Sequence, residues 1–253
     1  MFDCTMIPEV IHQVWIGENP VPRQDVEFAE TISHKKIMWA ENPDVIEGPW
    51  DEVRPLPALN MEYALEVLRD RCTPSFLPAA ISDIVRVEIL AQEGGCYLDT
   101  DVFQVRPLFP FLSNHTLCIS QEFSNRMIGN FMLASTPHHP ALYRYMTMVH
   151  NKIADYIPGR SDFNPVGITG PLVTSAAFLA SCDCSLLPFP MFSPWSQDHQ
   201  FPGNWKDVPW PEATLAVHAF SSKWVNVRKS KSTLRDGMSA TWRRGSGKIG
   251  GCG

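Results

Sequence analysis

Apolar residues in this chain follow two spacings, one typical of strands and the other of helices. Residues 7–16, IPEVIHQVWI, form a β-rich apolar run that stops at Gly17, which predicts a buried strand. The apolar positions within residues 79–93 instead repeat at helical spacing, which predicts a helix. We expect this helix to end at Gly94-Gly95, because glycine adopts the left-handed conformation of a helix end at little cost. The apolar stripe of this predicted helix consists of Ile81, Ile84, Val85, Ile89 and Leu90.

The segment after this helix predicts a strand that leads directly into acidic residues. Residues 96–98 form the short strand, Asp99-Thr100-Asp101 follow at once, and residues 102–105 continue as extended chain. An acidic pair in this position lies at the carboxyl edge of a sheet, where α/β proteins bind their ligands.

Strands and helices continue to alternate along the rest of the chain, which indicates a layered α/β fold. Residues 21–57 contain short elements broken by proline and tryptophan. A chain of 253 residues that is 44% hydrophobic can form one such domain, which we place at 1–235, followed by a basic, glycine-rich and flexible tail at 236–253. Further helices are predicted at 60–71 (with Asn60 as N-cap), 141–156 and 167–180, and further strands at 117–123, 130–134, 186–192 and 214–220.

Composition and charge exclude several classes of protein. The sequence shows neither a signal-peptide pattern nor about 18 consecutive apolar residues, so we expect a soluble cytoplasmic or host-cytosolic protein. Seven irregularly spaced cysteines favour reduced thiols. The net charge of −6 argues against a nucleic-acid partner. Residues 223–253 nevertheless carry eight Lys or Arg and one acidic residue, which predicts peripheral contact with an anionic membrane.

The chemistry with the clearest physical basis lies at Asp99 and Asp101. Two carboxylates two positions apart on extended backbone point to the same face, and they repel each other unless a cation lies between them. Oxygen ligands with open coordination positions suit a hard divalent cation that is shared with a diphosphate. The same residues also occur in ordinary acidic turns, so it is their place after a helix, Gly-Gly and a short strand that favours a ligand site.

Residues 82–102, SDIVRVEILAQEGGCYLDTDV, resemble the central motif of the DXD sugar-binding glycosyltransferases. This is family 32 of the retaining transferases, related to the yeast initiating α-1,6-mannosyltransferase and the Golgi α-1,4-glycosyltransferases, and more distantly to the clostridial glucosylating toxins. Residues 7–17 are similar to the first strand of that family. The resemblance implies a GT-A type fold with a central, mostly parallel sheet flanked by helices. Looser matches follow in the order of the family at Trp39 with Asn42-Pro43-Asp44 and at residues 128–140, 169–171 and 216–224.

The resemblance also implies roles for individual residues. Asp83 and Arg86 match the element that holds the donor sugar, and as i, i+3 neighbours they can pair on one helix face, with Arg86 also able to approach a phosphate. Asp99 would contact the ribose or the sugar, Asp101 would coordinate the metal, and His218 would be a second metal ligand or a phosphate contact. By the same resemblance Val14 and Trp15 would lie near the base, Asn130 would face the donor sugar and Trp224 would close over the diphosphate.

The function implied is metal-dependent, retaining transfer of a hexose from a UDP- or GDP-sugar, with Mn²⁺ or Mg²⁺ as cofactor. The acceptor would be a glycan, a lipid-linked sugar or a protein. The metal and Arg86 would stabilise the leaving nucleoside diphosphate.

Two alternatives stay open. A haloacid-dehalogenase-type phosphatase would use Asp99 as its nucleophile, but that family places the motif near the N-terminus and needs a later acidic pair, which this chain lacks. A non-catalytic sugar-nucleotide-binding protein would keep Asp83, Arg86, Asp99 and Asp101 unchanged.

Overall fold

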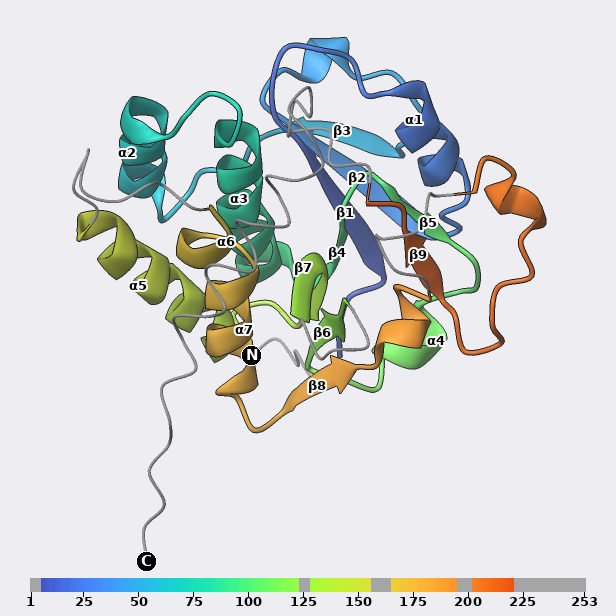
Figure 1. Ribbon diagram of the computed structural model, residues 1–253. Helices are drawn as coiled ribbons and strands as arrows, with labels where there is room; N and C mark the ends of the chain where they lie inside the picture. Colours follow the sequence, from blue (N-terminus) through green and yellow to red (C-terminus); the bar gives the residue numbers. More distant parts are fainter. Residues whose placement is uncertain (1–5, 123–127, 156–164, 195–201, 221–253) are drawn as a thin grey trace, which may run out of the picture. The chain divides into compact units, whose positions relative to one another are not determined.

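A seven-stranded sheet forms the centre of the computed structural model, which describes residues 6–122, 128–155, 165–194 and 202–220 (Figure 1). Its strand order is β3-β2-β1-β4-β7-β6-β8. Strand β7 is antiparallel to both of its neighbours, and the other neighbouring pairs are parallel. The predicted α/β fold with a mostly parallel central sheet is therefore confirmed, and this sheet is consistent with the predicted GT-A type. The strands are β1 Val10–Trp15, β2 Lys35–Ala40, β3 Glu52–Pro55, β4 Gly95–Leu98, β6 Leu117–Gln121, β7 Ile128–Ser135 and β8 Cys184–Leu187.

Helices flank this sheet, and a smaller antiparallel sheet pairs β5 (Val102–Gln104) with β9 (Ala216–His218). All described residues belong to one compact unit, residues 1–221, and the predicted tail lies outside them. The α-helices are α1 Arg23–Glu30, α2 Glu62–Arg71, α3 Leu77–Glu93, α4 Phe109–Leu112, α5 Pro140–Ala154, α6 Pro165–Ile168 and α7 Pro171–Leu179. Short 3-10 helices are η1 Pro43–Val45, η2 Phe189–Met191 and η3 Trp205–Asp207.

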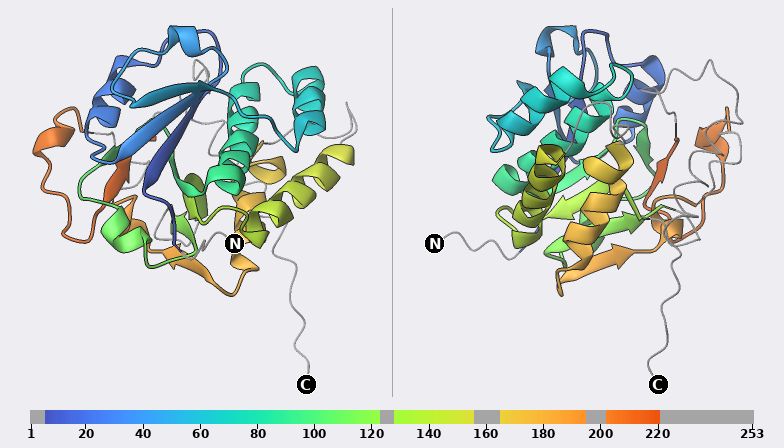
Figure 2. Two further views of the ribbon diagram at one scale, coloured as in Figure 1. Left: turned by 180° about the vertical axis from the view of Figure 1, so that it is seen from behind. Right: turned by 60° about the vertical axis from the view of Figure 1, so that its left-hand side comes forward.

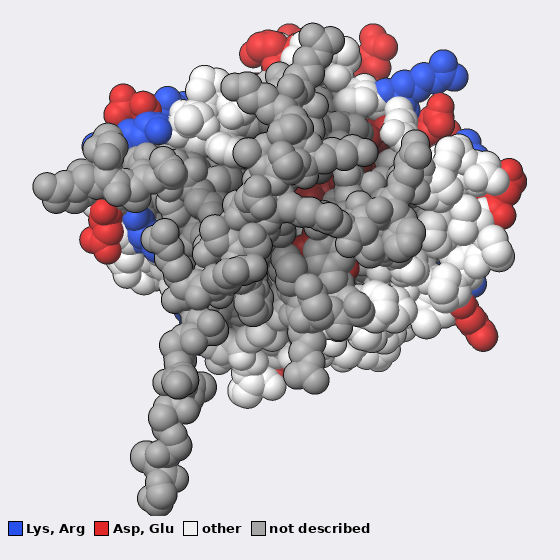
Figure 3. Space-filling model, in the orientation of Figure 1, with Lys and Arg blue, Asp and Glu red and all other residues white. Residues whose placement is uncertain are grey.

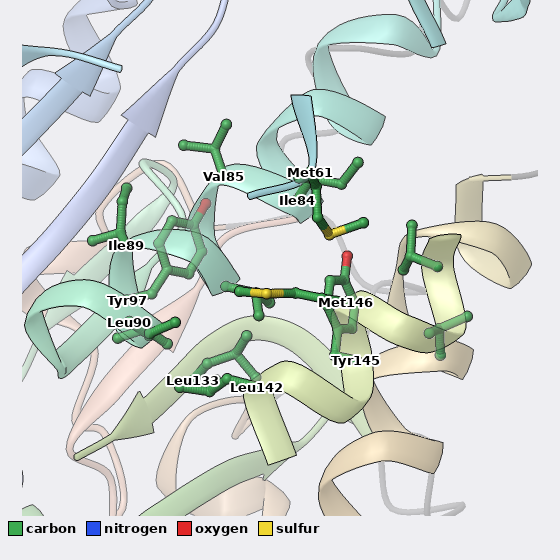
Figure 4. Packing of buried hydrophobic residues seen from close by; sticks show 14 of the residues in the cluster. Met61, Ile84, Val85, Ile89, Leu90, Tyr97, Leu133, Leu142, Tyr145 and Met146 are labelled. Atoms are coloured by element: carbon green, nitrogen blue, oxygen red, sulfur yellow. The ribbon is translucent and has the colours of Figure 1, made fainter. Parts of the chain in front are cut away.

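The two faces of the central sheet pack against different elements (Figure 2). Helices α2, α3, α5 and α7 cover one face, where Leu90 and Leu142 meet Tyr97 of β4 and Leu133 of β7 (Figure 4). Helix α4 and the β5–β9 pair pack on the other face. Helix α3 is buried along most of its length because the sheet lies on one side of it and other helices lie on the other.

The glycine pair after α3 ends the helix as predicted. Gly94 and Gly95 have φ angles of 68° and 96°, which favour glycine. A Cβ atom on Gly95 would also lie 2.8 Å from the carbonyl oxygen of Val10 in β1. The pair therefore lets the chain turn sharply from α3 into β4 beside the first strand.

Three local predictions need correction. Helix α2 begins at Glu62, and Asn60 does not cap it, because the buried carboxylate of Glu88 accepts hydrogen bonds from both the Asn60 amide and the Met61 backbone N–H. The helix predicted at 167–180 is divided, since α6 ends at Ile168 and α7 begins at Pro171. The extended segment predicted at 186–192 is strand only to Leu187 and then becomes η2.

A register shift in β7 changes which way its side chains point. The β6–β7 pairing is irregular between Ile119 and Gln121. As a result Leu133 packs on the α3 face whereas Phe131, two residues away, packs on the opposite face, although strict alternation would place both on the same face. Such bulges re-aim side chains near functional sites.

His12 links three of these elements inside the protein. Its Nε2–H donates to the Gly94 carbonyl oxygen at 3.0 Å, and its Nδ1 accepts from the indole of Trp39 at 3.1 Å. Burial, reinforced by the charges of Arg54 and Lys35, lowers the pKa of His12 from 6.5 to about 4, although the bond to Gly94 opposes the shift. Neutral His12 therefore fixes the start of β4 against β1 and β2.

Acidification should destabilise the fold through His12. Between pH 6.5 and about 4 the unfolded chain binds a proton that the folded protein does not, so this histidine should remove about 3 kcal/mol of folding free energy over that window. In His12→Gln, whose amide can supply one donor and one acceptor, this contribution should be missing. Urea unfolding of both proteins at several pH values measures the difference, and parallel stability curves would contradict the assignment.

Candidate metal and donor-sugar site

Asp99-Thr100-Asp101 form a tight turn between β4 and β5. The Val102 N–H donates to the Asp99 carbonyl oxygen at 3.1 Å, so the expectation of extended backbone at these residues is wrong. The turn lies at the carboxyl end of β4. Strands β2 and β3 follow β1 on one side of the sheet, and β4 lies on the other side of β1, so the strand order reverses between β1 and β4. Open α/β sheets bind ligands at such a reversal.

Pairing between β5 and β9 brings His218 to this turn. Val102 lies opposite His218 in the register, and the Ala219 N–H donates to the Asp101 carbonyl oxygen at 2.9 Å. His218 Nε2 lies 3.2 Å from Asp101 Oδ1. Ligand atoms of Asp99, Asp101 and His218 all lie within 4.8 Å of one another. Two carboxylates and one imidazole suit a divalent cation of the Mn²⁺ kind, with positions left for phosphate oxygens.

Negative charge is concentrated around His218. Burial alone would lower the pKa of this histidine, but Asp101, Asp99 and Glu122 together raise it above 6.5. Burial, aided by Asp99 and Asp101, also raises the pKa of Glu122, although His218 opposes the shift. The ring of Phe131 stacks on the imidazole at 4.4 Å between centroids. A bound dication would relieve the repulsion that these carboxylates otherwise exert on each other.

In the space-filling view, acidic atoms of described residues are visible between the grey atoms near the middle of the face that Figure 1 shows (Figure 3).

Asp83 and Asn130 form the second half of the site. The Asn130 amide donates to Asp83 Oδ1 at 2.7 Å, and the Thr169 hydroxyl donates to Oδ2 at 2.9 Å. The Tyr145 hydroxyl bonds the carbonyl oxygens of Asp83 and Thr169. Burial raises the pKa of Asp83 to about 6, although Arg86, Thr169 and Asn130 oppose the shift.

Arg86 is held by hydrogen bonds and ion pairs to the protein itself. Its side chain is 6% exposed, and its Nε donates to the Ser82 carbonyl oxygen. Nη1 contacts the Asn130 carbonyl oxygen at 2.7 Å and Asp99 Oδ1 at 3.1 Å. Nη2 contacts Ser82 Oγ at 3.0 Å and Asp83 Oδ1 at 3.3 Å. The guanidinium thus makes three hydrogen bonds and two close ion pairs within the protein, which hold it in one orientation.

Several residues that hold the acidic turn were not anticipated from the sequence. The Tyr97 hydroxyl donates to Asp99 Oδ1 at 2.6 Å, and the buried amide of Gln13 donates to the Asp99 carbonyl oxygen. The hydroxyl of Thr100 donates to buried Asp25 of α1 at 2.9 Å. Only Tyr97 carried a sequence signal, its position between Gly-Gly and Asp99. The others come from distant segments that the fold brings together.

The remaining predicted site residues are placed as follows. The Val14 side chain is buried in the core beneath α3, and Trp15 is half-buried with its indole donating to the Asn19 carbonyl oxygen at 2.7 Å. Their predicted position near the base stays a prediction. Trp224 lies outside the described residues.

Comparison with known families agrees with this geometry. Residues 29–124 match the family described as "Glycosyltransferase sugar-binding region containing DXD motif". This range contains Asp83, Arg86, Asp99 and Asp101. This part of the chain is therefore similar to the sugar-binding region of DXD-containing glycosyltransferases. The match favours the transferase interpretation over the phosphatase alternative.

Two curated relatives are mannosyltransferases by name. The chain is 29% identical over 155 residues to inositol phosphoceramide mannosyltransferase 1 of Schizosaccharomyces pombe, covering 57% of this chain and 42% of the relative. It is 26% identical over 174 residues to mannosyl phosphorylinositol ceramide synthase CSH1 of Saccharomyces cerevisiae, covering 68% of this chain and 43% of the relative. The chain therefore spans less than half the length of these relatives.

Solved structures of glycosyltransferases are also similar to this chain. The PaToxG glycosyltransferase matches with a TM-score of 0.49 and 19% identity, over 69% of this chain and 70% of that one. The UDP-bound glycosyltransferase domain of the YGT toxin matches with a TM-score of 0.48 and 12% identity, over 72% and 80%. TM-scores this low support no inference about the site. Among the described helices of this chain, none has both the length and the apolar character needed to cross a membrane.

Replacing Arg86 by lysine should damage the transferase region although the charge is kept. A lysine ammonium cannot reproduce the three hydrogen bonds and two ion pairs of the guanidinium, so buried carboxylate and carbonyl groups would lose partners, at a cost of about 3 kcal/mol in urea unfolding. Mn²⁺ affinity should fall about tenfold, because Asp99 would lose a supporting contact. Arg54→Lys, in a partly exposed ion-pair cluster with Glu52 and Glu93, is the matched control and should cost less than about 1 kcal/mol.

Asp101→Asn tests the metal site directly. Changes in the groups that only support metal ligands cost about 10–100-fold in affinity, so losing a charged ligand should weaken Mn²⁺ binding at least about 100-fold. Isothermal titration with MnCl₂ measures this. Asp70→Asn, at a side chain that is 78% exposed, should bind Mn²⁺ like the wild type. Equal Mn²⁺ affinity in the wild type and both variants would show that Asp101 is not a metal ligand.

Proposed function

We propose that this protein transfers a hexose from a nucleotide-diphosphate sugar to an acceptor hydroxyl, with a divalent cation as cofactor and retention of anomeric configuration. The observation that carries the proposal is the joining of two groups at one sheet edge. Asp99, Asp101 and His218 form the cation group, and Asp83 with Asn130 forms a polar group suited to sugar hydroxyls. Arg86 contacts members of both groups.

Each residue has a separate task in this mechanism. Asp101 and His218 would hold the cation, which when bound supplies positive charge against the leaving diphosphate. Asp83 accepts hydrogen bonds from Asn130 and Thr169 and is thereby fixed in one orientation, with lone pairs left for a sugar hydroxyl. Arg86 acts as a positioning residue, because its N–H groups bind the protein and orient Asp83 and Asp99. Stabilisation of the leaving group would provide most of the rate enhancement.

The donor and acceptor are proposed from the names of the relatives. Both relatives are named for mannosyl chemistry on an inositol-containing ceramide. A mannose donor, GDP-mannose, is therefore the first to test, and among the three predicted acceptor classes a lipid-linked one is favoured. The peripheral membrane contact predicted for the basic tail would suit such an acceptor.

A thermal-shift screen of nucleotide sugars should identify the donor. GDP-mannose and a panel of UDP-sugars are tested with and without MnCl₂ on the wild type and Asp101→Asn. A ligand at about 100 times its dissociation constant should stabilise the fold by about 2.7 kcal/mol. Stabilisation that needs Mn²⁺ and is absent from Asp101→Asn is the expected result. No shift with any nucleotide sugar would reject the donor site, and binding without release of nucleoside diphosphate would favour the non-catalytic alternative.

A further inference from the structure

One carboxylate beside the cation group has no task in the mechanism above. Glu122 directly follows β6 and is partly buried. Its charge interacts with His218, Asp99 and Asp101, so it lies close to the residues that would hold the cation. A carboxylate that adds a further negative charge to an already acidic site is unfavourable unless it serves the ligand.

A glycine makes room for this carboxylate. A Cβ atom on Gly129 would lie 3.1 Å from Glu122 Oε2 and 2.6 Å from the ring of Phe131. Gly129 is followed in β7 by Asn130, which bonds Asp83, and then by Phe131, which stacks on His218. Glu122 therefore lies at the start of β7, where the sugar-binding group and the cation group meet.

Glu122 is nevertheless not one of the metal ligands that the geometry defines. Among the described residues, the group whose ligand atoms lie within 4.8 Å of one another contains Asp99, Asp101 and His218, and it does not include Glu122. The charge of Glu122 is thus available to the molecule that the cation would hold. In a donor sugar bound through its diphosphate, the atom next to that phosphate is the anomeric carbon, and it becomes positively charged as the glycosidic bond breaks.

We propose that Glu122 is a catalytic carboxylate that faces the anomeric carbon of the bound donor and stabilises its positive charge. This inference rests on the proposed transferase function. The bond between the anomeric carbon and the diphosphate oxygen breaks, and its electron pair leaves with the nucleoside diphosphate. The acceptor oxygen forms the new bond to the anomeric carbon, and its proton passes to the leaving diphosphate. Glu122 stays ionised and forms no bond.

Glu122→Gln tests the charge with little change of shape. Hydrolysis of GDP-mannose in the presence of MnCl₂, or of the nucleotide sugar that stabilises the wild type, is followed by release of nucleoside diphosphate. The turnover number should fall about 100- to 1,000-fold, the range for removing one electrostatic contact to a transition state. Mn²⁺ affinity and donor affinity, from titration calorimetry, should stay within about threefold of the wild type, because Glu122 is not a ligand. Glu93→Gln, paired with Arg54 away from the site, is the control and should keep full turnover.

Two further variants separate charge from structure. Glu122→Asp keeps the charge and should be faster than Glu122→Gln. Glu122→Ala leaves a space in which sodium azide can replace the carboxylate, so azide should accelerate donor consumption and yield a glycosyl azide. Circular dichroism shows whether each variant folds, and if Glu122→Gln does not, Glu122→Asp and Glu122→Ala with azide decide.

Three results with the variants would overturn this inference and leave the transferase function standing. Turnover of Glu122→Gln within threefold of the wild type would show that its charge is not used. A parallel fall of turnover and Mn²⁺ affinity would make Glu122 a metal ligand instead. Equal rates for the Asp and Gln variants, with no effect of azide on the Ala variant, would leave only a structural role. A wild type that binds and consumes no nucleotide sugar would reject the transferase function itself, and this inference with it.

Discussion

The buried guanidinium of Arg86 is the contact on which the rest of the site depends. A charge taken out of water costs several kcal/mol unless its surroundings replace the lost hydration. Here two carboxylates, a hydroxyl and two carbonyl oxygens do so, and the ring of Tyr97 lies 4.4 Å below the guanidinium carbon. These partners come from α3, β4, β7 and the turn after β4. One side chain therefore fixes the relative positions of the sugar-binding group and the cation group.

Concentrated negative charge is the second constraint. Asp99, Asp101 and Glu122 lie close enough to raise the pKa of His218 against the effect of burial. Without a cation the fold must hold these like charges together, and the supporting bonds from Tyr97 and Arg86 to Asp99 offset part of that repulsion. Proteins accept such local cost where a ligand later relieves it, as perturbed groups at functional sites show.

The topology of the sheet explains why distant segments meet here. Strand β7 is reversed, so its first residues lie at the edge where β4 ends. The irregular pairing with β6 then turns Asn130 toward α3 and Phe131 toward His218. In a regular strand the side chains of Asn130 and Phe131 would each point to the opposite face of the sheet, and Asn130 would point away from Asp83.

The sequence by itself determined the local features of this protein. The stripe of α3, the Gly94-Gly95 ending, the strand before Asp99 and the i, i+3 placement of Asp83 and Arg86 all follow from periodicity and backbone preference, which act over a few residues. The spacing of Asp99 and Asp101 predicted a cation site, whereas the choice of His218 came from the resemblance to a family, because a lone histidine far along the chain has no such pattern. The tight turn at Asp99, in contrast, was misjudged as extended chain.

Only the tertiary structure decided which distant groups meet. The register of β5 with β9 sets His218 beside Asp101, and the bulge in β7 sets the direction of Asn130. The orientation of Arg86 depends on the Asn130 carbonyl oxygen of β7. The place of Glu122 depends on Gly129, also in β7, which has no side chain. Strand register and bulges are set by non-local packing, in which a shift of one residue reverses every side chain, so no local pattern could specify them.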